Sequence, residues 1–414
     1  MEATAEGVTS YRALMHVPGF PRLAFATLLV RAGASMWQLA LVLFVLQRYG
    51  SPSLAGISVF LAIAPGVLVS PIAGALLDRF GRVRLMVSDY AVSAAALAGI
   101  VVLAAVGAPL APLLVLVVIG SLMNPLGTSG SRSLFPMVIP SKLWDRANAV
   151  DSMFYMVTTV LGPPLAGAIV AFSSPETAIA ATAVVFLAGA LTLTGVRDVH
   201  SPRDDRAGLL VEARAGVLYV VRNRALRGLA VGMSVVNVGQ GIVIVALPVL
   251  VLERGYGGPQ LVGALWSLMG ASGIVSGLLA GRLGSVGRER PMLAFGILGI
   301  GSGIAAIAIA TSIGEVALGV VLIGIGSSVM DVALFSLRQR VTDPAWFGRA
   351  FAVSMHLNYS GIPIGSAVSG PLLAISTPFA LGVAVAFALA AAGLTWAMVP
   401  SSERAAQRLS RRTG

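Results

Sequence analysis

Gly74-Ala75-Leu76-Leu77-Asp78-Arg79-Phe80-Gly81-Arg82-Val83-Arg84 separates one apolar stretch of the chain from the next. Its first eight residues, GALLDRFG, align with GLLAGRLG at 277–284, which begins 203 positions later. The same distance separates RANAV at 146–150 from RAFAV at 349–353, and the glycines at 162 and 167 from those at 365 and 370. One distance shared by three separate places predicts that the chain is a duplication of a single unit.

Composition places this unit in a membrane. Of the 414 residues, 57% are hydrophobic and only 11% are charged, with a mean hydropathy of +0.90, whereas a soluble domain carries about 25% charged residues. Apolar stretches long enough to cross a hydrocarbon layer of about 30 Å recur along the chain. We expect twelve spanning helices, at 20–47, 53–77, 84–107, 110–134, 147–172, 177–196, 226–252, 260–283, 291–311, 314–338, 347–374 and 377–399.

The cations alternate with these stretches. All but three of the 28 Lys and Arg residues fall at the ends of the chain, in every second connecting segment, or in the span ends that border those segments; the exceptions are Arg31, Arg48 and Arg254. By the positive-inside rule this bias places both termini in the cytoplasm. The net charge of +11 could also suggest nucleic acid, but a nucleic-acid-binding protein would gather its cations on one polar domain. The excess of arginine over lysine hints at a bacterium, so we expect a multi-pass protein of a bacterial cytoplasmic membrane, without a nucleic-acid partner.

Several chemistries are disfavoured by missing residues. The chain has no cysteine, and His16, His200 and His356 are scattered without metal-ligand spacing. Neither a GxxxxGK[ST] phosphate loop nor a GxGxxG after a strand is present. We therefore expect no metal and no cofactor. An enzyme is not expected either, because no nucleophile–base pair is visible.

The segment at 74–84 resembles the loop signature of the major facilitator superfamily, G-x-L-a-D-R-x-G-R-[KR]-x, with Val83 as a mild departure. The resemblance implies an all-α membrane fold of twelve helices in two pseudo-symmetric six-helix bundles, working by alternating access. It places the bundles at 1–196 and 226–400, a cytoplasmic linker at 197–225 and a basic tail at 401–414. It also implies a conformational latch at Gly74, Asp78, Arg79, Gly81, Arg82 and Arg132. The second copy has Gly281 opposite Asp78, so an acidic latch would be one-sided. The alternative is a charged turn that only maintains topology.

A second signature lies in the fifth apolar stretch. Gly162-Pro163-Pro164-Leu165-Ala166-Gly167 resembles the family's "antiporter" motif, G-P-x-x-G-G, which is typical of exporters; Ala166 replaces the first closing glycine. Its key residues are Gly162, Pro163 and Gly167, and the alternative is a helix kink that serves packing alone. Together with RSLFP at 132–136, RANA at 146–149 and YRALMHVPGFPRL at 11–23, it looks like the exporter branch that contains enterobactin and macrolide efflux proteins.

Three of the acids fall well inside the predicted helices: Asp89, Asp151 and Asp331. Each needs a partner, water or a proton there. Asp89 and Asp151 lie near cytoplasmic arginine clusters, which favours structural pairing, although proton coupling stays open for both. Asp331 and Arg31 both lie about 13 Å from the inner ends of their helices, and the resemblance puts them in a central cavity. We expect Asp331 to exchange a proton while Arg31 pairs with it or binds an anionic part of the cargo; a permanent ion pair is the alternative. Related exporters carry an acid three residues after Arg31, where this chain has Ala34.

Polar and aromatic residues on the cavity-lining helices are candidates for cargo contact. They are Arg31, Trp37, Gln38, Asn124, Tyr155, Asn237, Gln240, Trp266 and Asn358. Few formal charges and many adaptable apolar side chains suit amphipathic cargo. We therefore expect a proton-coupled exporter of a drug-like small molecule, monomeric and surrounded by membrane lipid. An importer or facilitator on the same fold, and a membrane sensor or scaffold that moves nothing, are the alternatives.

Overall fold

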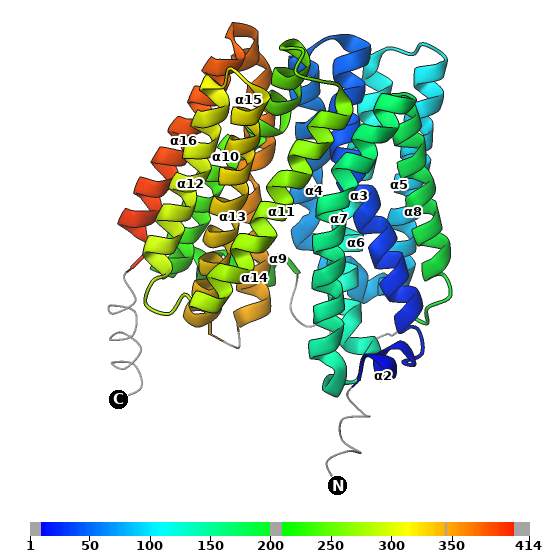
Figure 1. The fold of residues 1–414 in the computed structure, drawn as a ribbon. Helices are drawn as coiled ribbons and strands as arrows, with labels where there is room; N and C mark the ends of the chain where they lie inside the picture. The colour runs from blue at the N-terminus through cyan, green and yellow to red at the C-terminus, as the bar shows by residue number, and fades with distance from the viewer. Residues whose placement is uncertain (1–9, 199–208, 344–345, 401–414) are drawn as a thin grey trace. The chain divides into compact units, whose positions relative to one another are not determined.

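The computed structural model describes residues 10–198, 209–343 and 346–400. In these ranges every regular element is helical, as the apolar stretches predict (Figure 1). The helices are α2 (Tyr11–Met15), α3 (Phe20–Tyr49), α4 (Pro52–Phe80), α5 (Arg82–Ala105), α6 (Leu110–Val138), α7 (Trp144–Phe172), α8 (Pro175–Leu193), α9 (Leu209–Arg222), α10 (Arg224–Glu253), α11 (Pro259–Leu283), α12 (Glu289–Ile309), α13 (Ile313–Val341), α14 (Phe347–Tyr359), α15 (Gly361–Ile375) and α16 (Thr377–Met398), with the short 3₁₀ helix η1 (Ser141–Leu143) before α7.

Eleven helices of the described part are long and apolar enough to cross a membrane. They coincide with eleven of the twelve predicted spans, and α14 and α15 together cover the remaining one at 347–374. The expectation of a multi-pass, all-α membrane protein is therefore confirmed. α9 lies inside the stretch predicted as a linker, and the predicted basic tail at 401–414 is outside the described residues.

The prediction of one continuous helix over 347–374 is wrong at Ser360, where α14 ends and α15 begins. Pro363 follows three residues later, has no N–H to donate to the Tyr359 carbonyl, and places its ring against that carbonyl. Gly361 adds a residue with a low helix propensity. The Ser360 N–H instead bonds back to the His356 carbonyl at 3.1 Å and closes α14.

Side-chain caps determine where several helices begin. Ser174, Ser312 and Ser376 each accept a backbone N–H three residues on, at 3.1, 3.4 and 3.2 Å. The Glu315 carboxylate in turn accepts the Ser312 N–H, which completes a capping box. These caps satisfy N–H groups that no preceding turn can accept, so the polar residues between spans set the helix boundaries.

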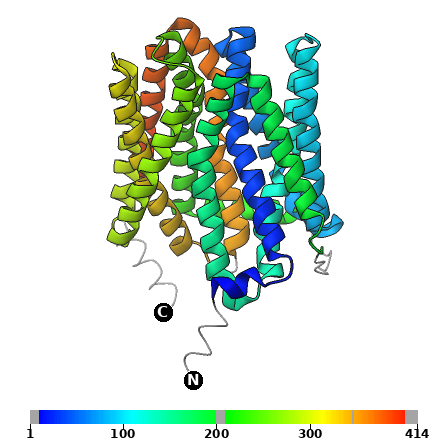
Figure 2. The same cartoon turned by 45° about the vertical axis from the view of Figure 1, so that its right-hand side comes forward.

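The chain forms two compact units. The first comprises Met1–Phe44 and Leu61–Arg206, and the second Val45–Phe60 and Ala207–Gly414. In the first unit α5 packs against α6 and α8, and both Figure 1 and Figure 2 show the short α2 (dark blue) lying across the N-terminal end of α3. In the second unit α10 packs against α14, α15 and α16, while α13 packs between α11 and α12.

α4 is shared between the two units, because the break between Phe60 and Leu61 falls within it. Its first turns lie against α15 so closely that a Cβ on Gly56 would come within 2.2 Å of the Ser366 carbonyl oxygen. Ser53 approaches Gly370 in the same way, at 2.3 Å from where that Cβ would lie. Glycine is required at both places, since any side chain would separate the helices.

The repeat noted in the sequence has a structural counterpart at the two turns that follow α4 and α11. Gly81 has φ 93° and ψ 134°, and Gly284, its equivalent 203 positions on, has φ 69° and ψ 155°. L-residues with side chains rarely adopt this backbone, so glycine is needed at both turns. The two copies therefore share a local conformation as well as sequence.

Candidate functional site

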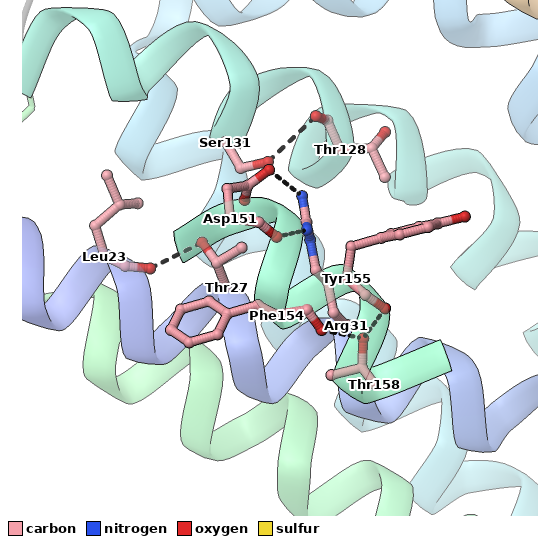
Figure 3. A network of polar contacts seen from close by, with 9 residues as sticks. All are labelled: Leu23, Thr27, Arg31, Thr128, Ser131, Asp151, Phe154, Tyr155 and Thr158. Atoms are coloured by element: carbon pink, nitrogen blue, oxygen red, sulfur yellow. Dashed lines mark hydrogen bonds and ion pairs between the residues drawn. The ribbon is translucent and has the colours of Figure 1, made fainter. Parts of the chain in front are cut away.

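An ion pair joins α3 to α7 inside the first unit. The Arg31 Nη2 lies 2.9 Å from Asp151 Oδ2, and Arg31 Nη1 donates to the Asp151 backbone carbonyl at 2.8 Å (Figure 3). Only 20% of the Arg31 side chain and 28% of the Asp151 side chain are exposed. Sequence reasoning had coupled Arg31 to Asp331 and had placed Asp151 with the cytoplasmic arginines. The structure gives Arg31 a carboxylate partner on the neighbouring helix instead.

Tyr155 completes this cluster, one turn after Asp151 on α7. The Arg31 Cζ lies 5.7 Å from the centre of the Tyr155 ring, within the range of a cation–π contact. Tyr155 is nevertheless 59% exposed, so a large part of its surface is accessible. Thr128 and Ser131 of α6 belong to the same network of polar contacts (Figure 3). An open aromatic ring beside a half-buried cation is a surface suited to an organic molecule with both apolar and polar parts.

The "antiporter" motif lies farther along α7 and sets how closely α7 approaches α3. A Cβ on Gly162 would fall 2.4 Å from the Ser35 Cβ, so the two backbones touch there. Ala166 and Gly167 are buried. α7 runs unbroken from Trp144 to Phe172 although Pro163 lies inside it. The motif thus lies in the same α3–α7 interface as the Arg31–Asp151 pair.

The turn between α4 and α5 is held from two sides. Arg82 Nε donates to Ser133 Oγ at 3.1 Å, and Arg82 Nη1 lies 2.9 Å from the Met137 Sδ, which ties the turn to α6. The Asp198 carboxylate accepts the N–H groups of Arg82, Val83 and Arg84 at 3.1, 3.4 and 3.4 Å. A carboxylate at a helix N-terminus satisfies unpaired N–H groups and opposes the positive end of the helix dipole.

The sequence does not reveal Asp198 as a functional residue, because it lies more than a hundred residues after the turn, in the stretch predicted as a linker. Of the predicted latch residues, Gly81 supplies the turn conformation and Arg82 the contacts to α6, while the exposed Arg79 extends over the ring of Phe80, 5.5 Å from its centre. The side chains of Asp78 and Arg132 and the surroundings of Gly74 lie outside the described part of the structure.

Asp89 lies on α5 and is only 3% exposed. Its carboxylate accepts from Ser93 Oγ at 3.2 Å and from the backbone of Gly127 on α6. No cation forms an ion pair with Asp89 among the described residues. A Cβ on Gly127 would lie 2.2 Å from Asp89 Oδ2, so this glycine makes room for the acid. The geometry is that of a helix–helix hydrogen bond between α5 and α6.

In the second unit, polar residues of α10, α13 and α14 converge. Asn237 Nδ2 donates to the Asn358 backbone carbonyl at 2.8 Å, and Gln240 Nε2 lies 3.5 Å from Ser327 Oγ. Asp331 lies one turn after Ser327 on α13 and is exposed. Within the described residues its carboxylate takes part in no hydrogen bond and no ion pair. The structure therefore brings together Asn237 and Asn358, and it leaves the Asp331 carboxylate on a membrane helix without a hydrogen-bonding partner in the described residues.

Arg338 is a second residue that the sequence reasoning missed. It was counted among the cytoplasmic cations at the end of a helix predicted over 314–338, but α13 continues to Val341 and Arg338 is fully buried. With the Asn358 amide in the orientation that satisfies both groups, its oxygen accepts from Arg338 Nη2 at 2.5 Å and its nitrogen donates to the Ser354 carbonyl at 2.9 Å. Arg338 also lies seven residues after Asp331, on the same face of α13. That spacing was a signal that the sequence offered.

The remaining cavity candidates are less constrained. Gln38 and Asn124 are exposed, and Trp37 and Trp266 are half-buried. Contact of these four residues with cargo stays a prediction. Among the described residues, no group of three or more His, Cys, Asp or Glu is placed to hold a metal ion.

Comparison with known proteins shows which family this chain belongs to. The sequence profile of the Major Facilitator Superfamily matches residues 23–366. The MFS-type transporter y4rN of Sinorhizobium fredii, described as uncharacterized, is 37% identical over 371 residues, which are 88% of this chain and 91% of that protein. The multidrug efflux pump Tap of Mycobacterium tuberculosis is 26% identical over 395 residues, covering 91% of this chain and 92% of Tap.

Solved structures agree on the fold. The nucleoside transporter NupG superposes with a TM-score of 0.76 at 12% identity, covering 92% of this chain and 99% of that one. A peptide transporter of the POT family gives a TM-score of 0.74 at 15% identity, covering 93% and 94%. The profile match, the full-length relatives and the two repeated units lead to one assignment. The chain belongs to the Major Facilitator Superfamily, whose members are transporters rather than enzymes.

Proposed function

We propose that this protein is a secondary active exporter of amphipathic, drug-like molecules, driven by protons entering the cell. It would work by alternating access between the two bundles predicted at 1–196 and 226–400, in a bacterial cytoplasmic membrane with both termini in the cytoplasm. The observation that carries the proposal is the packing of Gly162 of the "antiporter" motif against Ser35, in the same α3–α7 interface as the Arg31–Asp151 pair. The full-length similarity to the multidrug efflux pump Tap supports export.

Cargo binding is assigned to the cluster around Arg31. The exposed ring of Tyr155 offers an apolar surface, and Arg31 and Asp151 offer one charge of each sign at a part-exposed position. Because the pair is nearly neutral as a whole, it can orient a polar group on the cargo without requiring a cargo of fixed charge. Such a surface fits molecules with an aromatic or aliphatic body and one polar end.

Proton coupling is assigned to Asp331. Its carboxylate is without a hydrogen-bonding partner in the described residues, so no hydrogen bond has to break when it gains or loses a proton. Arg338 lies two turns away on the same face of α13 and supplies a fixed positive charge. An ionised Asp331 would be attracted by that charge and a protonated one would not. Protonation would therefore change the electrostatic energy of the second unit.

Transport in proteoliposomes tests the proposal. Protein is reconstituted with a lipophilic fluorescent dye, a pH gradient of either direction is imposed, and dye movement is followed for the wild type, Asp331→Asn and Glu315→Gln. Glu315→Gln is the matched control, because it removes a carboxylate at the other end of α13 and a glutamine keeps the cap. Gradient-driven flux should fall at least about tenfold in Asp331→Asn, while gradient-free dye exchange continues.

The same assay distinguishes the alternatives. Unchanged gradient-driven flux in Asp331→Asn would overturn the coupling role. Dye that accumulates in the direction of the proton flow would indicate an importer that uses symport, and dye movement that ignores the gradient would indicate a facilitator. Dye binding without any flux would indicate a sensor or scaffold.

A further inference from the structure

A cavity of about 520 Å³ opens between α11, α12 and α13 of the second unit. One side is a stripe of α11 at four-residue spacing, Val275, Leu279 and Leu283, and all three side chains are exposed. The other side is formed by Ile325 and Val329 of α13, also one turn apart. We call this the α11–α13 groove. Its walls are apolar over the length of several helical turns, which suits a hydrocarbon chain lying along the helices.

The mouth of the α11–α13 groove carries positive charge. Arg288 lines it and donates from Nη2 to the Leu283 carbonyl at 2.6 Å, which fixes the guanidinium at the end of α11. Arg282, on the last turn of α11, is also exposed, but it does not line the groove. The acid of this turn, Glu289, is buried and already forms an ion pair with Arg340. The described part of the chain thus supplies no carboxylate to neutralise Arg288.

The groove is separate from the charged face of α13. Successive residues of an α-helix are rotated by about 100°, so Val329 and Asp331 point about 160° apart around α13. Asp331 and Ser327 therefore face nearly opposite to the groove wall. A molecule in the groove would not touch the residues assigned to proton coupling.

The groove also lies at the second copy of the repeated turn. In the first copy, Asp198 and Arg82 hold the turn closed. In the second copy Gly281 replaces the acid of the motif, and a Cβ there would meet nothing within 4 Å. The absence of a side chain leaves open space beside α11. The two turns share their backbone conformation, and the second opens onto an apolar groove.

We propose that the α11–α13 groove binds one anionic phospholipid of the cytoplasmic leaflet, with an acyl chain along Val275 and Leu279 and the phosphate on Arg288. The choice of leaflet rests on the orientation given with the proposed function. Charge complementarity selects the occupant, because a basic mouth between membrane helices on the cytoplasmic side attracts anionic headgroups. A guanidinium binds phosphate through charge-assisted hydrogen bonds, which a zwitterionic lipid meets less favourably.

Native mass spectrometry of the purified full-length protein in detergent tests the site. Phosphatidylglycerol and phosphatidylcholine with identical acyl chains are titrated against the wild type, Arg288→Ala and Arg282→Ala. Arg282→Ala is the matched control, since it removes an equal charge six residues away on a side chain that does not line the groove. The first phosphatidylglycerol should bind about tenfold more weakly to Arg288→Ala than to the wild type and the control.

A second variant tests the apolar wall without altering charge. Val275→Trp fills the groove from an exposed position, so it should lose the preferred phosphatidylglycerol while its unfolding temperature stays that of the wild type. Equal weakening in Arg282→Ala and Arg288→Ala, or equal binding of the two lipids to the wild type, would overturn the proposal. These measurements involve no flux, so their failure would leave the transport assignment untouched, and the reverse also holds.

Discussion

The Arg31–Asp151 pair is neither fully buried nor fully exposed: about a fifth of the Arg31 side chain and just over a quarter of the Asp151 side chain are exposed. A charge in that position is stable only while its partner remains, because a lone half-buried ion loses hydration without a compensating contact. The pair therefore contributes both to the stability of the first unit and to the polarity of the proposed cargo surface.

Removing one member should cost more than removing both. Arg31→Gln leaves the Asp151 carboxylate without its cation, and we expect the free energy of unfolding to fall by about 1–3 kcal/mol. The double variant Arg31→Gln/Asp151→Asn should recover part of that loss, because two neutral amides can hydrogen bond. Thermal unfolding in detergent of both single variants and the double variant measures the coupling. Strictly additive losses would show that the contact contributes nothing.

Gly127 offers a residue-level test of packing. Gly127→Ala would put a Cβ 2.2 Å from Asp89 Oδ2 and 2.7 Å from the Tyr90 ring, and overpacking of this kind costs about 1–3 kcal/mol. Gly120→Ala on the same helix meets nothing within 4 Å, so it should keep or slightly raise the unfolding temperature. Equal unfolding temperatures for the two variants would contradict the close α5–α6 contact.

Some of this could be predicted from the sequence and some could not. Arg31, Asp151 and Asp331 were recognisable as ionisable residues inside apolar stretches. Their partners were not, because the sequence gives the height of a residue along its helix but not which neighbouring helix its side chain faces. Arg338 was misjudged for a related reason: a boundary error of three residues changed a buried arginine into an apparent surface cation.

Among the helices, α5 depends on a residue far from it in sequence. The only side chain in the described residues that caps its first turn is Asp198, which follows α8. The start of α5 and the segment that follows α8 are thus linked. No local pattern revealed this, because the usual capping residue just before α5 is Gly81, which has no side chain.

Asp198→Ala should therefore loosen α5 without unfolding the protein. We expect the amides of Arg82, Val83 and Arg84 to exchange with deuterium up to about tenfold faster, as befits the loss of a cap worth roughly 1 kcal/mol. Hydrogen exchange followed by mass spectrometry on peptides covering this turn gives the rate. Arg197→Ala, one residue earlier and exposed, serves as the control and should exchange as the wild type does.

The break at Ser360 shows a second limit of predicting structure from the sequence, which concerns where helices are interrupted. Apolarity predicted the stretch at 347–374 well, but it does not report helix continuity, and the decisive signal was the Gly361-Ile362-Pro363 sequence. In α7, by contrast, Pro163 and Pro164 are accommodated within an unbroken helix. A proline is therefore an insufficient sign of a break in this chain, even directly after a glycine, as Gly162-Pro163 of α7 shows.

For the molecule as a whole, the orientation in the membrane remains a prediction from the arginine distribution, and the absence of cysteine makes it easy to test. Val106 and Val286 are 72% and 76% exposed, in turns predicted to lie on opposite sides. Val106→Cys should react with a membrane-impermeant maleimide in intact cells, and Val286→Cys only after permeabilisation. The reverse pattern would invert the topology and move the lipid groove to the other leaflet.

Burial is distributed unevenly within the second unit. Over its most apolar stretch, 78% of the residues of α10 are buried, against 22% for α11. α10 packs against α14, α15 and α16, with Gly361 and Gly365 at the places where α15 comes closest to its backbone. Any tilt of α10 alone would disrupt several helix–helix interfaces at once. We therefore expect this helix to move only together with the helices packed around it. α11 packs chiefly against α13 and leaves most of its surface exposed, so bending on its exposed side during a transport cycle would disrupt fewer contacts.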